Sequence, residues 1–176
     1  MSQIAYLNHI GSKVGTIRFA CTSKHVISVA IGGKTQSKLE ELLISRNYTL
    51  SYGSVPIIHK LKMELKEYFG GKRRQFTIPP LFQGTAFQIR VWQTLHSIPF
   101  GETITYGELA HLCGYPNASR AVGGAMAKNK IPIIIPCHRV LAANRKLGGF
   151  TGGLDVKRFL LHLEDISPVS HRDPIH

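Results

Sequence analysis

The residues of this chain best suited to chemistry are a cysteine and a histidine that stand side by side, Cys137 and His138. A deprotonated thiol is a strong nucleophile, and a histidine acting as a base can generate it. Neighbouring residues of a strand point to opposite faces, so contact within the pair needs either a turn at Pro136 or a bridging water molecule. The alternative is an inert buried thiol, because apolar surroundings disfavour the charged thiolate.

An acidic residue and a glycine-rich loop follow this pair. Glu164 ends a predicted helix, and a carboxylate there can orient a histidine base. The predicted buried stripe of that helix has four apolar members: Val156, Phe159, Leu160 and Leu163. Residues 148–153 contain four glycines, and a backbone of this kind can close over a flat ring. Taken alone, the same loop fits a flexible turn.

The three cysteines, at positions 21, 113 and 137, include no Cys-x-x-Cys pair. We therefore expect neither a disulfide framework nor a tetrahedral zinc site. Cys21 and His25 could supply two zinc ligands, with His9 as a third, but a strand cysteine and a surface histidine on either side of a turn explain the same pattern. We expect no metal, no cofactor and reduced thiols in a cytoplasmic protein, or a nuclear one if the source is eukaryotic.

Three predicted helices must position these groups. Capping-box spacings predict helix starts at Thr85 and Thr105. Gly114 breaks the second helix, and Asn117 is expected to cap a third over residues 118–127.

The second and third of these helices, joined by a turn that contains glycine, have the pattern of a helix-turn-helix motif. The third is dominated by small residues and carries one charged side chain, Arg120. Such a surface lets DNA approach closely but offers little for recognising base edges. It suits sequence-independent contact in the minor groove. The alternative is an ordinary helix pair that packs on itself.

The first part of the chain has the pattern of a small α/β module without catalytic groups. Hydrophobic periodicity predicts strands and helices there: strands at 16–21, 26–31 and 73–78, and helices at 37–43 and 54–69. Pro79, Pro80 and Gly84 interrupt the chain, and we place a domain boundary near residue 83.

The charge of the chain favours a polyanionic partner. There are 22 Lys and Arg against 10 Asp and Glu, a net charge of +12. The charge is +8 up to residue 83 (12 minus 4) and +4 after it (10 minus 6). Each phosphate contact releases counterions, which favours nucleic acid, although charge also serves solubility. No apolar run approaches the roughly 18 residues of a membrane span, and no secretory signal pattern opens the sequence.

The sequence from Thr85 to Glu164 resembles the O6-alkylguanine-DNA alkyltransferases. Residues Pro136 to Val140 are similar to the active-site signature of that family. The resemblance continues in order and with compatible gaps through further segments: Phe87-Gln88, Val91-Trp92, Ile98 to Thr103, Tyr106-Gly107, Arg120 to Gly124, Asn129, the loop 148–153, Lys157 and Leu160-Leu161. The first 83 residues resemble the variable N-terminal domain of the family only loosely.

The resemblance implies irreversible transfer of an alkyl group from O6-alkylguanine in DNA, and by extension from O4-alkylthymine, to the protein's own cysteine. Cys137 would accept the alkyl group. His138 would take the thiol proton through a water molecule, with Glu164 orienting His138. Tyr106 would donate a hydrogen bond to a ring nitrogen of the departing guanine.

The resemblance also implies a DNA-binding surface and a substrate pocket. Arg120 would fill the gap left by a flipped nucleotide, with Ala121 and Gly123 of the same helix against the DNA. Asn129 would brace the turn between that helix and the active site. The pocket would be lined by five residues: Pro132, Val140, Gly148, Phe150 and Thr151.

Two residues depart from the family's pattern. Phe150 stands where tyrosine is frequent, so the hydrogen bond of that hydroxyl would be absent. Thr77 stands where zinc-binding members have a histidine ligand, in line with the expectation of no metal. Two other classes of function compete: a damage sensor without chemistry, against which the presence of Cys137 argues, and a Cys-His hydrolase, which multiple turnover would distinguish.

We therefore predict an α+β protein with two domains. Residues 1–83 form an RNase H-like α/β domain. Residues 84–168 form a mostly helical, winged-helix-type domain for DNA binding and alkyl transfer, and 169–176 a disordered tail. The expected partner is double-stranded DNA containing O6-alkylguanine, contacted in the minor groove whatever its sequence. We expect a monomer that does not associate with membranes.

Overall fold

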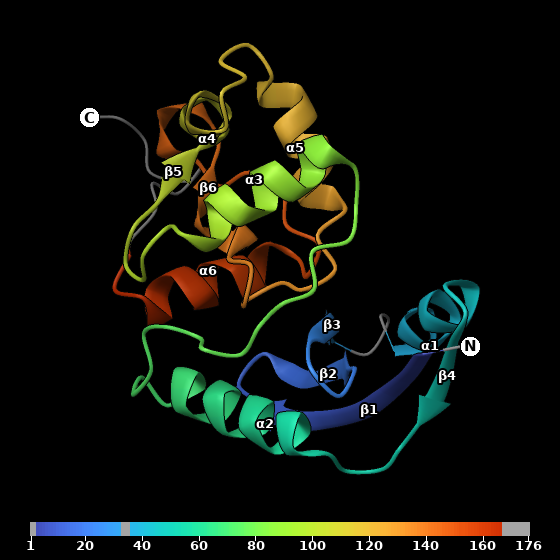
Figure 1. Ribbon diagram of the computed structural model, residues 1–176. Helices are drawn as coiled ribbons and strands as arrows, with labels where there is room; N and C mark the ends of the chain where they lie inside the picture. The colour runs from blue at the N-terminus through green and yellow to red at the C-terminus, as the bar shows by residue number, and fades with distance from the viewer. Residues whose placement is uncertain (1–2, 33–35, 167–176) are drawn as a thin grey trace. The chain divides into compact units, whose positions relative to one another are not determined.

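The computed structural model describes residues 3–32 and 36–166 and has an α+β fold, as predicted (Figure 1). The chain divides into two units, one up to Leu81 and one from Phe82, close to the boundary that the sequence suggests near residue 83. The tail predicted at 169–176 lies outside the described residues. No helix in the described ranges has the length and apolar character needed to cross a membrane.

The first unit contains a four-stranded sheet with the strand order β3-β2-β1-β4. Its strands are β1 (Gln3–Ser12), β2 (Gly15–Cys21), β3 (Val26–Ile31) and β4 (Tyr48–Ser51). The pairs β1–β2 and β2–β3 are antiparallel, and β4 runs parallel to β1. The strands predicted at 16–21 and 26–31 are confirmed as β2 and β3, whereas β1 and β4 were not predicted from the sequence.

Two helices pack on this sheet, α1 (Gln36–Ser45) and α2 (Pro56–Phe69). Leu39 and Leu43 of α1 join a buried cluster with strand residues that include Ala5 and Leu7. Helix α2 lies alongside β1 (Figure 1) and buries an apolar face that includes Ile58, Leu61 and Leu65. Pro56 opens α2, where a proline costs no hydrogen bond because that N–H has no partner within the helix.

The strand predicted at 73–78 is wrong: this segment is irregular. The backbone N–H groups of Thr77 and Ile78 donate to the carboxylate of Glu64 in α2, at 3.0 and 3.3 Å. Glu64 is fully buried. The Glu64 oxygens bind the backbone N–H groups that would otherwise pair with a neighbouring strand. The alternation of apolar residues, taken alone, therefore predicted a strand that does not form.

The second unit is mostly helical. Its elements are α3 (Ala86–His96), β5 (Ile104–Thr105), α4 (Tyr106–Leu112), α5 (Ser119–Ala127), β6 (Val140–Leu141) and α6 (Leu154–Leu163). The short strands β5 and β6 pair in parallel. Both predicted capping boxes are present, at Thr85 and Thr105. The indole N–H of Trp92 donates to the carbonyl of Ala125 at 3.0 Å and ties α3 to α5.

The turn between α4 and α5 begins at Gly114, as predicted. Gly114 has a φ of +85°, and the N–H groups of Gly114 and Tyr115 donate back to His111 and Ala110. This is a Schellman motif, which favours glycine at the left-handed position. The predicted cap at Asn117 is wrong. The N-cap residue is Ala118, whose side chain has no acceptor, and Asn117 lies within the turn that the Ala118 N–H closes onto the carbonyl of Tyr115.

The buried face of α6 also differs from the prediction. Lys157, Leu160 and Leu161 are buried, whereas three of the four expected stripe residues are only partly buried: Val156, Phe159 and Leu163. The pattern of apolar residues placed a lysine on the solvent side, and the structure places it in the core.

Candidate active site

The apolar run before Cys137 is a tight turn rather than a strand. Ile133 has a φ of +74°, which is rare for a β-branched residue, and the Ile135 N–H donates to the Ile131 carbonyl at 2.9 Å. Pro136, with φ −81° and ψ 64°, has the geometry of an inverse γ-turn, and the Cys137 N–H donates to the Ile135 carbonyl at 2.8 Å. The turn suggested at Pro136 is therefore present, and backbone hydrogen bonds fix the position of Cys137.

Asn129 ties this turn together. Its Nδ2 donates to the Ile135 carbonyl at 3.0 Å, and its Oδ1 accepts from the Ile131 N–H at 2.9 Å. The polar side chain of Asn129 also acts to lower the pKa of the Cys137 thiol. Pro132 lies within the same turn, where it pairs with Ile135.

A buried cluster of His138, Arg139 and Glu164 stands next to Cys137. Nε2 of His138 lies 2.9 Å from Oε1 of Glu164. Arg139 donates to both carboxylate oxygens, at 2.8 and 2.9 Å, and to the carbonyl of Ile98. All three side chains are buried. The sequence analysis assigned no role to Arg139, because no local pattern indicates that a residue at this position pairs with Glu164.

The electrostatics of the cluster leave the imidazole neutral. Burial lowers the pKa of His138, against the opposing effect of Glu164. Burial alone would raise the pKa of Glu164, but hydrogen bonds from His138 and Arg139 hold it well below its usual range. A neutral imidazole that donates through Nε2 to the carboxylate has Nδ1 as an acceptor. Nδ1 is buried and has no hydrogen-bond partner in residues 3–32 and 36–166, so it is available as a base.

The thiol of Cys137 is protonated in this resting arrangement. Burial raises its pKa to about 11, although Asn129 and the charge of Lys157 act in the opposite direction. Burial lowers the pKa of Lys157 to about 8, against the effect of Cys137. The ammonium of Lys157 donates to the carbonyls of Val140, at 2.7 Å, and Gly148, at 3.2 Å. The thiol therefore needs a base to become a nucleophile, and Lys157 holds the loop beside it.

Cys137 opens onto a cavity of about 290 Å³. The cavity is lined by Cys137 and by residues of α4, α5 and the glycine-rich loop: Tyr106, Gly123, Met126, Ala127, Gly149, Phe150 and Thr151. Of the residues predicted for the pocket, Phe150 and Thr151 line it. Val140, Gly148 and Pro132 are not among the lining residues, while Met126, Ala127 and Gly149 are lining residues that the sequence did not single out.

Tyr106 is the first residue of α4 and is half-buried at the wall of this cavity. Burial raises its pKa, and the nearby Cys137 adds to the effect. The phenol therefore stays protonated and can donate a hydrogen bond to a molecule in the cavity. Within residues 3–32 and 36–166, no cluster of three or more His, Cys, Asp or Glu side chains is arranged to hold a metal ion.

Comparison with known proteins identifies the family. Residues 86–166 match the family described as 6-O-methylguanine DNA methyltransferase, DNA binding domain. The chain is 51% identical over 113 residues to the methylated-DNA–protein-cysteine methyltransferase of Haemophilus influenzae, covering 64% of this chain and 63% of that protein. It is 45% identical over 113 residues to the constitutive enzyme of that name from Bacillus subtilis, covering 64% of this chain and 68% of that protein. The chain belongs to the methylated-DNA–protein-cysteine methyltransferase family. The aligned part spans less than two thirds of the Haemophilus influenzae methyltransferase.

Solved structures of the methyltransferase family are similar to this chain over a larger part of its length. The crystal structure of the O6-methylguanine methyltransferase from Mycobacterium tuberculosis has a TM-score of 0.80 and 36% identity, covering 94% of this chain and 96% of that one. The structure of that methyltransferase in complex with DNA has a TM-score of 0.76 and 36% identity, covering 90% of this chain and 92% of that one.

Helix α5 presents the residues that the resemblance to these methyltransferases predicts for DNA contact. Arg120 and Ala121 are exposed, and Gly123 is half-buried at the cavity. Within the described ranges, the guanidinium of Arg120 makes no hydrogen bond or ion pair, so it is free to bind an external group. The structure thus brings Gly123, Tyr106 and Cys137 to one cavity and leaves Arg120 on the exposed side of α5.

Gly148→Ala is expected to displace Tyr106 from the wall of the cavity and so to slow, by about tenfold or more, the alkyl transfer that membership of this family leads us to expect. A methyl group at Gly148 would lie 3.0 Å from a ring carbon of Tyr106 and 3.1 Å from its hydroxyl oxygen. Gly11→Ala is the control, since a methyl group there meets nothing within 4 Å and Gly11, in β1, does not line this cavity. Single-turnover rates on a duplex with one O6-methylguanine measure the effect, and equal rates for the two variants would contradict it.

Proposed function

We propose that this chain repairs alkylated DNA by transferring the alkyl group of O6-alkylguanine irreversibly to Cys137. The observation that carries the proposal is a buried thiol that opens onto a cavity with a phenol donor, beside a histidine held by a carboxylate. The alkylated oxygen of guanine is out of reach inside a duplex, so the nucleotide must leave the base stack. A cavity of about 290 Å³ is close to the lower size limit of small-molecule sites and suits a single flipped base.

In the proposed reaction, Nδ1 of His138 takes the proton of the Cys137 thiol through a water molecule. The sulfur attacks the alkyl carbon, and the bond between that carbon and the guanine oxygen breaks with its electron pair left on guanine. The hydroxyl of Tyr106 donates to a ring nitrogen and stabilises the departing anion. Glu164 keeps His138 oriented and stabilises its protonated form. The product is a thioether without a leaving group, so each molecule acts once.

The same proposal covers the DNA contact. The second unit is the DNA-binding and alkyl-transfer domain, of winged-helix type, and α5 enters the minor groove without regard to sequence. The likeness to a methyltransferase solved in complex with DNA supports this assignment.

The first unit has a strand order and a parallel fourth strand compatible with an RNase H-like domain. The protein acts as a monomer, and O4-alkylthymine is a second substrate.

Arg120→Ala is expected to slow repair of a duplex by about one to two orders of magnitude, because the gap left by the flipped nucleotide then stays unfilled and unstacking costs a few kcal/mol. The reaction with free O6-benzylguanine, which needs no flipping, should change little. Arg90→Ala, which removes an exposed arginine from α3, controls for loss of charge. Equal loss on both substrates would contradict a role in flipping.

Titration with an excess of O6-methylguanine duplex tests the proposed function. The amount of guanine restored should rise with time and stop at one equivalent of protein. Continued turnover would favour a Cys-His hydrolase. Tight binding to the lesion without any restored guanine would favour a damage sensor.

A further inference from the structure

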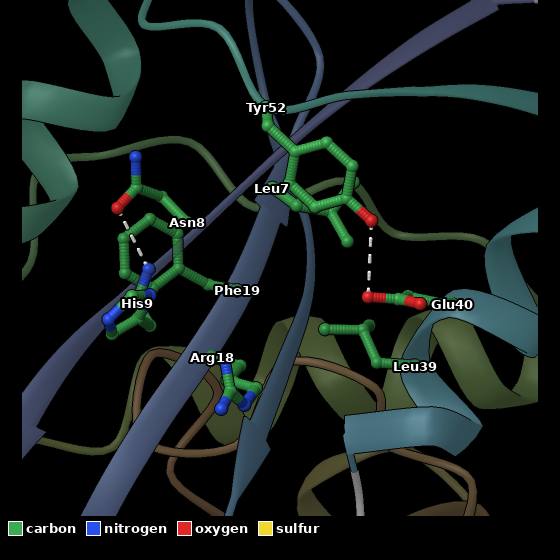
Figure 2. Close-up of a pocket in the computed structure, with 8 residues that line it drawn as sticks. All are labelled: Leu7, Asn8, His9, Arg18, Phe19, Leu39, Glu40 and Tyr52. Carbon is green, nitrogen blue, oxygen red and sulfur yellow. Dashed lines mark hydrogen bonds between the residues drawn. The ribbon is translucent and has the colours of Figure 1, made fainter.

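A second cavity lies in the first unit, far along the chain from the residues of the proposed reaction. Its volume is about 350 Å³, and it lies between β1, β2, helix α1 and Tyr52 (Figure 2). Leu7 of β1 and Leu39 of α1 are buried and form apolar parts of its wall. A concave apolar wall with a few polar groups is the usual form of a small-molecule site.

One side of this cavity carries two nitrogen-rich side chains. His9 of β1 and Arg18 of β2 are direct partners in the antiparallel register, which puts their Cβ atoms about 5 Å apart on one face of the sheet. Arg18 is half-buried and His9 is exposed. Across residues 3–32 and 36–166, neither side chain has a hydrogen bond or an ion pair. A half-buried guanidinium without a carboxylate partner is suited to an oxyanion, which it binds with two parallel hydrogen bonds.

The other side of the cavity carries a carboxylate. The hydroxyl of Tyr52 donates to Oε1 of Glu40 at 3.3 Å, and Figure 2 shows the two side chains pointing toward each other. Oε2 of Glu40 has no partner among the described residues. A free carboxylate oxygen beside a phenol accepts hydrogen bonds from amino groups. The cavity thus offers donors for an anion on one side and an acceptor for an amino group on the other.

We propose that this cavity binds a small phosphate monoester of nucleotide size whose base carries an amino group. Arg18 and His9 bind the phosphate, Leu7 and Leu39 pack against the body of the ligand, and Glu40 accepts from the amino group. The charge of the surrounding unit is compatible with an anionic ligand, since the residues up to Leu81 carry 12 basic and 4 acidic side chains, or +8. This site is independent of the proposed repair function.

Calorimetric titration of the full chain with adenosine 5′-monophosphate tests the site. We expect saturable binding at one site, weakened about tenfold or more by Arg18→Gln, which removes the bidentate contact. Glu40→Gln should weaken adenosine 5′-monophosphate but not ribose 5-phosphate, which has no amino group. Lys24→Gln, in the exposed turn between β2 and β3, removes the same charge outside the cavity and should change nothing.

Nuclear magnetic resonance on the same samples separates this site from the cavity at Cys137. The amide signals of Leu7, Arg18 and Glu40 should shift with nucleotide, and those of Cys137 and Thr151 should not. No saturable binding at millimolar nucleotide would overturn the proposal, as would equal weakening by Arg18→Gln and Lys24→Gln. The proposal also fails if Arg18→Gln lowers the affinity for duplex DNA while the nucleotide does not bind, because the anion would then be a backbone phosphate.

Discussion

Cys137→Ala is expected to abolish alkyl transfer, by at least about 10⁴-fold, while leaving the affinity for DNA unchanged. The thiol is the only group in the proposed reaction that forms a bond to the alkyl carbon, so nothing replaces it. The proposed DNA contact comes from α5 and its exposed Arg120, which the substitution does not touch. Transfer kinetics and fluorescence anisotropy with the same O6-methylguanine duplex measure the two properties separately.

Cys113→Ala is the matched control for this variant. Cys113 is also a buried cysteine of the second unit, at the end of α4, and it does not line the cavity. We expect its transfer rate to stay close to that of the unmodified protein. Transfer retained by Cys137→Ala, or lost by Cys113→Ala with the fold intact, would show that the acceptor is misassigned.

Glu164→Gln is expected to lower the free energy of unfolding by about 3–5 kcal/mol, because it leaves the charge of Arg139 buried without a counter-ion. Both carboxylate oxygens bind Arg139, and one of them also binds His138. Urea unfolding followed by circular dichroism measures the loss. Glu102→Gln, at an exposed position of the same unit, should cost little, and equal stability of the two variants would contradict this account of the cluster.

In the protein without substitutions, the same cluster should make the free energy of unfolding depend on pH. The folded pKa values of His138 and Glu164 both lie below their ordinary values, so the unfolded chain binds more protons than the folded one at low pH. Each group therefore stabilises the fold above its unfolded pKa, about 6.5 for histidine and about 4.3 for glutamate. We expect the free energy of unfolding to fall as pH drops below about 6.5, and again below about 4.3. Glu164→Gln should reduce the second loss but not abolish it, because hydrogen bonds from Thr105 also lower the pKa of Glu108.

Local sequence patterns predicted the elements that depend on local interactions. The capping boxes at Thr85 and Thr105 are present because the two side chains of each box bond backbone within one turn. Gly114 ends α4 because its left-handed backbone is needed there. By contrast, β4 has four residues, too few for a period, and it exists through pairing with β1. The segment 73–78 failed as a strand because a distant carboxylate, Glu64, binds its donors.

The candidate site, too, was only partly predictable from the sequence. The pair Cys137 and His138 and the position of Glu164 at a helix end are visible in the sequence. The roles of Arg139 and Lys157 are not, because charged residues are normally exposed and only tertiary packing buries these two. The apolar stripe expected on α6 did not include Lys157. A lysine can nevertheless occupy a core position when its ammonium group donates to backbone carbonyls, as it does here.

The most direct test of the central claim is mass spectrometry of the protein after incubation with an oligonucleotide that carries one O6-methylguanine. The intact mass should rise by one methyl group per molecule and no further, however large the excess of DNA. Peptide fragmentation should place that methyl group on Cys137. A protein that binds the lesion tightly without any gain in mass, or that carries the methyl group on another residue, would contradict the account.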